Sequence, residues 1–454
     1  MIGIVNFKGK RLTMCLTALA VSVLNIVAQT GETVPTGRLS LTLEKAIEIA
    51  LAENPTIRVA DKDVQLKQIA DREAWHKLLP TLDATLTFSH AIKVAEMKIG
   101  GNKVKFGQDG TSTATGVIAL NVPVFAPAVY QNMKLTKEDI QLAQEKARGS
   151  RLDLINQVTK AYYGALLSSD SYEVMKQSYN VAKENFDVVN NKYKVGSVSE
   201  YDKLSAEVQE RSTHSAMVSA ETGKNLALLQ LKVLMGITAN VEIAIDDSLS
   251  AYEKKLTLMD GIVTENDLDG NSSLRQIEKN MSLLQRTRKL LRTNFMPTVA
   301  LSLSGQYQSV SNTDWNFFGY EYSPSATLAL TVNIPIFHLD NWTKLKSNRV
   351  QLAQLEDTRT NTRHQLTMAA ESYRQNMASS MAQVSSNAEA VRQAEKAVQI
   401  SSKRYDVGRG TILELNQSET NEIMAKLTYV QSIYDYLTNR ADLDYTLGRE
   451  TYLK

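Results

Sequence analysis

The sequence predicts a mainly helical fold with a membrane β-barrel portion, built from a β-hairpin and a long coiled-coil helical hairpin that each occur twice. Three observations predict this fold. Short motifs recur in the same order at nearly the same distance, four segments alternate between apolar and polar residues, and the long segments between them carry a helical apolar period with few glycines and prolines. Together they indicate one structural unit that has been duplicated.

The duplication is visible in motifs that keep both their order and their spacing, 212 or 217 residues apart. The matched pairs are Asn121–Phe125 with Asn333–Phe337, Tyr193–Gly196 with Tyr405–Gly408, Leu234–Gly236 with Thr446–Gly448, and Leu79–Pro80 with Met296–Pro297. We therefore expect a first repeat over residues 29–236, a linker over 237–255, a second repeat over 256–449 and a tail over 450–454. A period of about 200 residues is too long for a solenoid and indicates domain duplication.

The first 28 residues have the pattern of a secretory signal peptide. Lys8, Lys10 and Arg11 precede an uncharged run over residues 12–27, and a small residue follows at the expected cleavage site. The alternative is a membrane anchor helix, although this run is shorter than the roughly 20 residues that a span requires. Cleavage would remove Cys15, the one cysteine of the chain, so we expect no disulfide in the exported protein.

The composition excludes several classes of protein. The 454 residues include 51 Lys and Arg against 49 Asp and Glu, which gives a formal net charge of +2. A nucleic-acid partner is not expected, because proteins that bind nucleic acids carry a basic excess. With 21 Gly and 8 Pro, the chain favours long uninterrupted elements over linkers and low-complexity sequence.

Each repeat opens with helical sequence and continues as two strands. In the first repeat, helical segments over about 41–53 and 55–79 end at Pro80, which cannot continue a helix. The expected strands cover about residues 81–97 and 112–125 in the first repeat, and about 298–310 and 325–337 in the second. Each alternates over roughly 10 to 14 residues, which is enough for a tilted barrel strand to cross a bilayer.

A long helical hairpin follows the strands in each repeat. In the first, apolar and aromatic residues recur at spacings of three and four, which is typical of a coiled-coil seam. These residues are Tyr172, Met175, Tyr179, Ala182, Phe186, Val189 and Tyr193. A helix from about 128 to 194 would be on the order of 100 Å long. We expect the hairpins to turn at residues 195–197 and 407–410, where glycine supplies the left-handed cap.

Four strands cannot form a stable membrane structure alone. The two edges of such a sheet leave backbone groups unpaired, and about eight strands are needed to close a barrel. We therefore expect other copies of the same chain to complete the barrel. The alternative is a soluble dimer whose sheets pack face to face.

The duplicated order of helix, strand hairpin and helical hairpin resembles the TolC family of outer-membrane efflux proteins. The strand ends at Asn121–Phe125 and Asn333–Phe337 and the Tyr-x-Val-Gly tips carry the resemblance, which covers about residues 39–449. It implies a homotrimer with a 12-stranded barrel in outer-membrane lipid, a 12-helix periplasmic tunnel, and a mid-tunnel belt that includes residues 237–255. It also implies docking to a periplasmic adaptor protein and an inner-membrane transporter. The chain would then be the exit channel of a tripartite efflux or type I secretion system.

The resemblance further implies a gate at the periplasmic ends of the helices. Counted from the tip glycines, the family's inter-hairpin Asp and Tyr fall on Asp202 and Tyr405, and an acidic ring position falls on Glu414. The family's basic latch falls on Gly410 and its polar partner on Tyr201, so we expect a different set of bonds here. Three copies of Glu414 around an axis would favour cations. The alternatives are ordinary first-turn helix acids at Asp202 and Glu414, and a seam aromatic at Tyr405.

The two hairpin tips are the expected docking sites for the adaptor. They project furthest, and glycine leaves their backbone exposed. The alternative is that glycine lies there only because a hairpin needs it to turn. The tip residues are Val195, Gly196 and Ser197 in the first hairpin, and Val407, Gly408, Arg409 and Gly410 in the second.

The sequence predicts no enzyme, metal site or cofactor. Its five histidines are scattered, with no pair at i,i+4 and no partner cysteines, and it contains no P-loop or nucleophile-elbow motif. Two other classes stay open, a stand-alone outer-membrane diffusion channel and a structural coiled-coil protein of the envelope. The cargo is not specified, because a tunnel lined by polar side chains is not a selective pocket.

Overall fold

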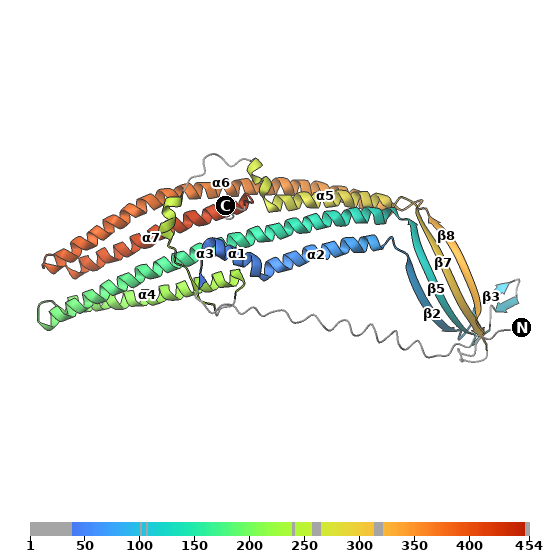
Figure 1. Ribbon diagram of the computed structural model, residues 1–454, viewed down its shortest axis with the longest axis horizontal. Helices are drawn as coiled ribbons and strands as arrows, with labels where there is room; N and C mark the ends of the chain where they lie inside the picture. The colour runs from blue at the N-terminus through green and yellow to red at the C-terminus, as the bar shows by residue number, and fades with distance from the viewer. Residues whose placement is uncertain are drawn as a thin grey trace.

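The computed structural model describes residues 39–99, 102–105, 108–237, 241–256, 265–312 and 321–449. Figure 1 shows an elongated molecule in which long helices run along the length and a sheet lies at one end. The expected signal peptide, residues 1–28, and the expected tail, residues 450–454, lie outside the described residues. Within the described ranges, the helices lack the combination of length and apolar character that crossing a bilayer requires.

The first half of the chain runs down the molecule and returns to its middle. It contains β1 (Leu39–Ser40), α1 (Leu43–Glu53), α2 (Pro55–His76), β2 (Thr81–His90), β3 (Glu96–Ile99), β4 (Asn102–Lys105), β5 (Ser112–Phe125), α3 (Pro127–Lys194) and α4 (Glu200–Met235). α3 runs from the sheet to the opposite end of the molecule, and α4 comes back beside it (Figure 1).

The second half repeats this order. It contains β6 (Ile243–Ala244), the 3-10 helices η1 (Leu249–Lys255) and η2 (Glu265–Gly270), α5 (Ser272–Thr293), β7 (Thr298–Ser311), β8 (Ser323–Asn333), α6 (Leu339–Asp406) and α7 (Ile412–Thr446). α6 has 68 residues, the same number as α3. At about 1.5 Å per residue, each is on the order of 100 Å long.

The main sheet has the strand order β2-β5-β7-β8, and all its pairs are antiparallel. The central pair, β5 with β7, joins the two repeats. The register lines up leucines across all four strands, in a row formed by Leu82, Leu120, Leu303 and Leu328. Because partners directly across a ladder share a face, the sheet has one mainly apolar and one mainly polar face. The neighbouring row, on the other face, contains Asp83, Ala119, Ser304 and Thr327.

The first strand is shorter than the sequence predicted. We expected it to reach residue 97, but β2 ends at His90, and β3 and β4 form a separate small hairpin. The chain leaves the sheet at Ala91, whose carbonyl accepts a bond from Gly110 N at 2.7 Å. The Asp109 side chain then binds the Val94 amide at 2.7 Å. These contacts close the end of the strand pair, so the alternation that continues beyond residue 91 belongs to the loop.

The fourth strand also differs from its expected bounds of 325–337. β8 covers Ser323–Asn333, and its pairing with β7 ends opposite Thr298, the first residue of β7. In β5, the corresponding motif continues as strand to Phe125, because it pairs with β7 across a bulge. Among the strands that the structure describes, β8 is an edge strand with β7 as its one neighbour, and Pro335 cannot donate to a ladder. The same motif therefore has two structures in the two repeats.

Two asparagines join the short helices to the ends of the return helices. Asn54 caps α2 by accepting from Thr56 N at 2.8 Å, and its Nδ2 donates to the Leu234 carbonyl at the end of α4 at 2.7 Å. Asn271 caps α5 in the same way, and its Nδ2 donates to the Thr446 carbonyl of α7 at 2.8 Å. α2 therefore begins where α4 ends, and α5 begins where α7 ends.

The main core lies at mid-length, where α1 and the linker pack on α3, α4 and α7. Its largest fully buried side chains include Tyr162, Leu231, Met235, Ile433 and Tyr436. The predicted coiled-coil seam of α3 is confirmed, because Ala182 and Val189 are buried and the other five seam residues are half-buried.

Candidate functional site

The two hairpin tips have the same backbone geometry. Gly196 has φ +74° and Gly408 has φ +72°, the left-handed conformation that favours glycine. In the first tip, Gly196 N donates to Tyr193 O at 2.9 Å and Ser197 N to Lys192 O at 2.8 Å. The same pair of bonds recurs in the second tip, and this pattern is a Schellman motif. Val195 and Val407 are 79% and 68% exposed, so both tips present an apolar side chain to solvent.

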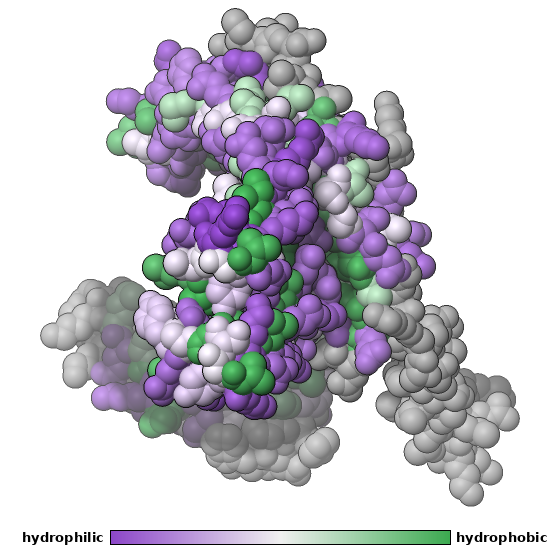
Figure 2. Space-filling view, turned by 90° about the vertical axis from the view of Figure 1, so that its left-hand side faces the viewer, coloured by the Kyte–Doolittle hydropathy of each residue, from purple (hydrophilic) through white to green (hydrophobic). Residues whose placement is uncertain are grey.

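The tip end as a whole is mixed in character. Figure 2 looks onto this end and shows hydrophobic side chains at the surface among hydrophilic ones. The exposed apolar residues of α4 near its start are Tyr201, Leu204 and Val208. Their spacing of three and four puts them on one side of the helix.

The predicted gate acids Asp202 and Glu414 occupy the same position, the third residue of a return helix. Asp202 closes a capping box, in which its carboxylate accepts from Ser199 Oγ at 2.7 Å and from Ser199 N at 3.2 Å. Glu414 N binds Thr411 Oγ1 at 3.2 Å, but its carboxylate lies 3.6 Å from Arg404 of α6. Both acids complement the positive end of a helix, and Glu414 has the freer carboxylate.

A small apolar cluster, the tip cluster, joins the two hairpins. It consists of Val189 on α3, Ala206 on α4, and Ile412 and Leu415 on α7, with Phe186, Val198 and Tyr405 packed against it. Its four central residues are at most 3% exposed. All four long helices contribute to the tip cluster or its margin, so the hairpins are in contact at their ends in this structure.

Tyr405 enters this cluster through its ring rather than its hydroxyl. Among the described residues, its buried Oη has no hydrogen-bond partner. Burial raises the pKa of Tyr405, and the nearby carboxylates of Asp202 and Asp406 raise it further. The structure thus brings Asp202 close to Tyr405 without a bond between them, and the gate roles of both remain predictions.

Lys192 provides a polar contact between the hairpins that the sequence analysis missed. Its Nζ lies 5.4 Å from the centre of the Tyr405 ring and 3.7 Å from Asp406 Oδ1, both on α6. The ion pair is half-exposed and contributes at most about 1 kcal/mol, with a similar amount from the cation–π contact. A basic residue one turn before the tip glycine was the available signal.

A second polar contact between the hairpins lies further from the tips. Asn185 Nδ2 on α3 donates to Glu419 Oε1 on α7 at 2.6 Å. Glu419 is 7% exposed and is the one charged side chain among the buried residues of the described ranges. Burial raises the pKa of Glu419 to about 7, Asn185 lowers it and Glu422 raises it. The sequence signal was an acid four residues after Leu415, on the apolar period of α7.

At mid-length, the linker holds α3 and α7 together. Tyr162 and Tyr252 both donate to Asp247 Oδ2, at 3.1 and 3.3 Å, and Asp170 of α3 accepts from Leu249 N at 2.9 Å. Tyr429 of α7 donates to Glu253 at 2.7 Å. The strand β6 pairs in parallel with β1. Between the linker and the tips, the two hairpins are held together only by the side-chain contacts between them.

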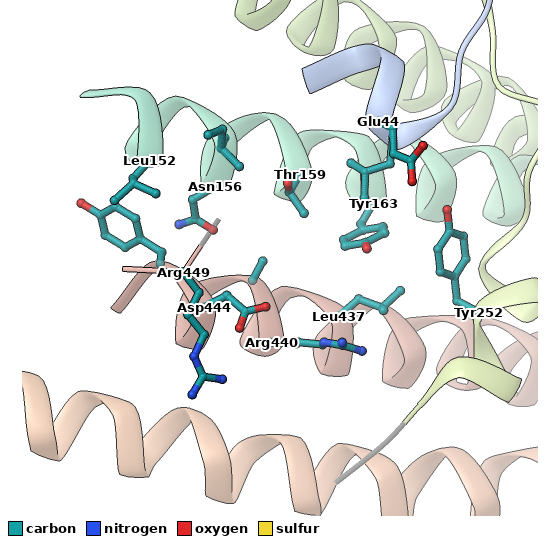
Figure 3. Close-up of a pocket in the computed structure, with 14 residues that line it drawn as sticks. Glu44, Leu152, Asn156, Thr159, Tyr163, Tyr252, Leu437, Arg440, Asp444 and Arg449 are labelled. Atoms are coloured by element: carbon teal, nitrogen blue, oxygen red, sulfur yellow. The ribbon is translucent and has the colours of Figure 1, made fainter. Parts of the chain in front are cut away.

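A cavity of about 340 Å³ lies beside the linker, between α1, α3 and α7. In Figure 3, Tyr163 points from α3 toward α7 beside Tyr252, and their ring centres are 5.6 Å apart. Arg440 and Asp444 of α7 line the same cavity. The lining mixes both charges with aromatic rings. Within the described ranges, no group of three or more His, Cys, Asp or Glu side chains could hold a metal ion.

The sheet with one apolar face, the long duplicated hairpins and the contacts at their tips define a class of protein, the elongated outer-membrane channels built on long helices. Residues 46–237 and 264–449 match the sequence profile of the outer membrane efflux protein family, and the chain belongs to this family. It is therefore a protein of the outer membrane, with its helices extending into the periplasm.

Solved structures share this fold at low sequence identity. The chain is similar to the CmeC outer membrane channel of Campylobacter jejuni (TM-score 0.72, 16% identity, covering 94% of this chain and 93% of that one). It is similar to the outer membrane protein VceC of Vibrio cholerae, with a TM-score of 0.69, 16% identity, and coverage of 90% of this chain and 96% of that one. It is also similar to the open state of the MtrE outer membrane channel of Neisseria gonorrhoeae, with a TM-score of 0.68, 18% identity, and coverage of 93% of this chain and 96% of that one. A comparison with curated proteins found no match.

Proposed function

We propose that this protein is the outer-membrane exit channel of a tripartite efflux or type I secretion system. It acts as a passive conduit that is gated at its hairpin tips and opened when a periplasmic adaptor and an inner-membrane transporter dock. One observation carries the proposal. In the described part of the chain, a four-stranded sheet with an apolar face and two unpaired edges lies at one end of helices on the order of 100 Å long.

The unpaired edges support assembly with further copies of the chain. In lipid, each unpaired backbone group would cost several kcal/mol, so β2 of one copy must pair with β8 of the next. Two or more copies would supply the roughly eight strands that a closed barrel needs. The family likeness, rather than the strand count, favours three copies, so the proposed assembly is a homotrimer with twelve strands.

The helix edges support the same arrangement. Exposed apolar residues lie on α2 and on α6, the helices that continue from the two edges of the sheet. They are Val59, Leu66 and Ile69 on α2, and Trp342 and Val350 on α6, each more than half exposed in the single chain. A ring of copies would bring these two edges together and bury them.

The tip contacts support gating by separation of the hairpins. The tip cluster is small and its polar contacts are weak, so an adaptor that binds the exposed tips could supply enough binding energy to part them. We propose the tip residues as the adaptor site, with Asp202, Tyr405 and Glu414 at the gate. Three copies of Glu414 would favour cations at the aperture.

The proposal is tested with the full-length protein purified from the outer membrane. We expect the mass of three polypeptides in detergent and discrete single-channel conductance in planar bilayers. Deletion of the gene should sensitise cells to exported compounds, and deletion of a neighbouring adaptor gene should have the same effect. A monomer without conductance would support an envelope scaffold instead. Conductance whose cellular role does not depend on an adaptor would support a stand-alone diffusion channel.

A further inference from the structure

The starting observation is where Glu419 lies. It is on α7, seven residues beyond the first residue of that helix, and faces α3 of the other hairpin. The linker holds α3 and α7 together at mid-length and the tip cluster holds them at the end, so Glu419 lies in the part of the interface that must separate if the hairpins part. Ionised carboxylates are seldom buried without a cationic partner.

Among the residues that the structure describes, the surroundings of Glu419 offer one hydrogen-bond donor and no cation within ion-pair distance. Asn185 of α3 donates at 2.6 Å. A small cavity of about 50 Å³ adjoins the carboxylate, and its α3 side is neutral, formed by Val174, Gln177, Ser178 and Val181. The charged groups nearby are Glu422 and Lys426 on α7 itself and Glu395 on α6. Lys426 Nζ forms ion pairs with Glu422 at 2.7 Å and with Glu395 at 3.2 Å.

We propose that Glu419 is a gate-positioning residue, and that proton binding at its carboxylate, buried against Asn185 between the hairpins, favours the closed tips. This inference rests on the proposed function, because it assigns a control element to the same gate. It differs from the predicted gate residues in position and chemistry. Asp202 is half-buried and Glu414 is exposed at the tips, whereas Glu419 is buried between α3 and α7.

The direction of the effect follows from the two environments. Burial raises the pKa of Glu419 to about 7 while the hairpins are joined, and separation would return the carboxyl to water and to its ordinary value of about 4.5. The joined state therefore binds the proton more tightly. This stabilisation is complete below about pH 4.5 and is lost as the pH rises through about 7. Between pH 6 and pH 8, the ratio of joined to separated hairpins should fall about tenfold in each protomer.

The experiment measures tip separation and conductance as functions of pH in the full-length assembly. Spin labels are attached through the substitutions Ser197→Cys and Arg409→Cys, one on each tip, because the expected cleavage of residues 1–28 removes Cys15, the one native cysteine. In the wild type, we expect the distances between the tips to lengthen and the open fraction in bilayers to rise as the pH increases from 6 to 8. Glu419→Gln stays neutral and can still accept from Asn185. It should keep the short distances and the low open fraction at pH 8.

Two further variants make the test specific. Asn185→Ala removes the donor that lowers the Glu419 pKa, so the midpoint of the pH response should move upward. Glu389→Gln removes an exposed acid of α6 that pairs with Arg392 in its own helix, and it should follow the wild type. If Glu419→Gln retains the wild-type pH response, the proposal is overturned. If the tip distances change with pH but neither the wild type nor any variant conducts ions, the proposed channel function is wrong and the proposed effect of proton binding at Glu419 is supported.

Discussion

At the scale of single residues, the two proposed gate acids differ in what their carboxylates contact. The carboxylate of Asp202 accepts the cap bonds of its own helix, whereas the carboxylate of Glu414 lies beside Arg404. The two positions are equivalent in the repeats, so the difference comes from their neighbours. The first tip has no arginine at the place of Arg404, where Lys192 instead reaches across to the ring of Tyr405.

The hydroxyl of Tyr405 is predicted to be dispensable for tip contact. Tyr405→Phe removes a buried polar atom without a partner among the described residues, so the tip should be unchanged or more stable by up to about 1 kcal/mol. Tyr405→Ala removes the ring from the tip cluster and should cost about 1–3 kcal/mol. Hydrogen exchange of amides in the last turns of α3 and α6 measures both effects. Equal acceleration in the two variants would show that the hydroxyl carries the contact.

Glu414 and Arg404 form a matched pair for testing ion preference at the proposed aperture. Their side chains are half-exposed and 3.6 Å apart, so the ion pair is weak and screened, and each charge still contributes to the potential at the tip. Glu414→Ala should lower the cation-to-anion permeability ratio by roughly a few-fold, and Arg404→Ala should raise it. Reversal potentials across a KCl gradient give this ratio. Unchanged potentials in both variants would leave Glu414 as a helix-cap acid alone.

At the scale of elements, Asn54 and Asn271 align short helices on the ends of the return helices. Each makes a cap bond and a bond to the end of another helix while less than 7% exposed. Asn271→Ala should destabilise the start of α5 by about 1–3 kcal/mol, because it removes the cap and leaves a buried carbonyl unpaired. Hydrogen exchange in the first turn of α5 is the measurement. The exposed Asn191→Ala, within α3, is the control and should change little.

The elements were largely predictable where local chemistry sets them. Pro55 begins a helix, Gly196 and Gly408 end helices, and the spacing of Ala182 and Val189 set the seam. The errors lie where contacts with other segments of the chain determine where a strand ends. β8 stops at Asn333, opposite Thr298, where its partner β7 begins, and Asp109 holds the chain away from the sheet after Ala91.

The site was less predictable than the fold. The contact of Asn185 with Glu419 depends on how α3 and α7 are rotated about their axes, and the apolar period of one helix does not fix the rotation of its neighbour. The positions of Asp202 and Tyr405 could be found by counting from the tip glycines. The hydrogen bonds that their side-chain atoms make could not be predicted in this way.

At the scale of the whole molecule, the two faces of the sheet decide where the protein resides and how it assembles. Leu86 lies in the middle of β2 on the apolar face and is 76% exposed, whereas Thr85 beside it points to the polar face. Leu86→Lys should destabilise the membrane-inserted sheet by about 2–4 kcal/mol in each copy, and this loss would occur three times in a trimer. Thr85→Lys, the matched control, would meet only the water-filled interior of the proposed barrel. We expect Leu86→Lys to deplete assembled trimers from the outer-membrane fraction while Thr85→Lys leaves them intact and changes conductance at most. Equal yields of trimer from both variants would mean that the leucine face does not contact lipid, and the proposed barrel would have to be abandoned.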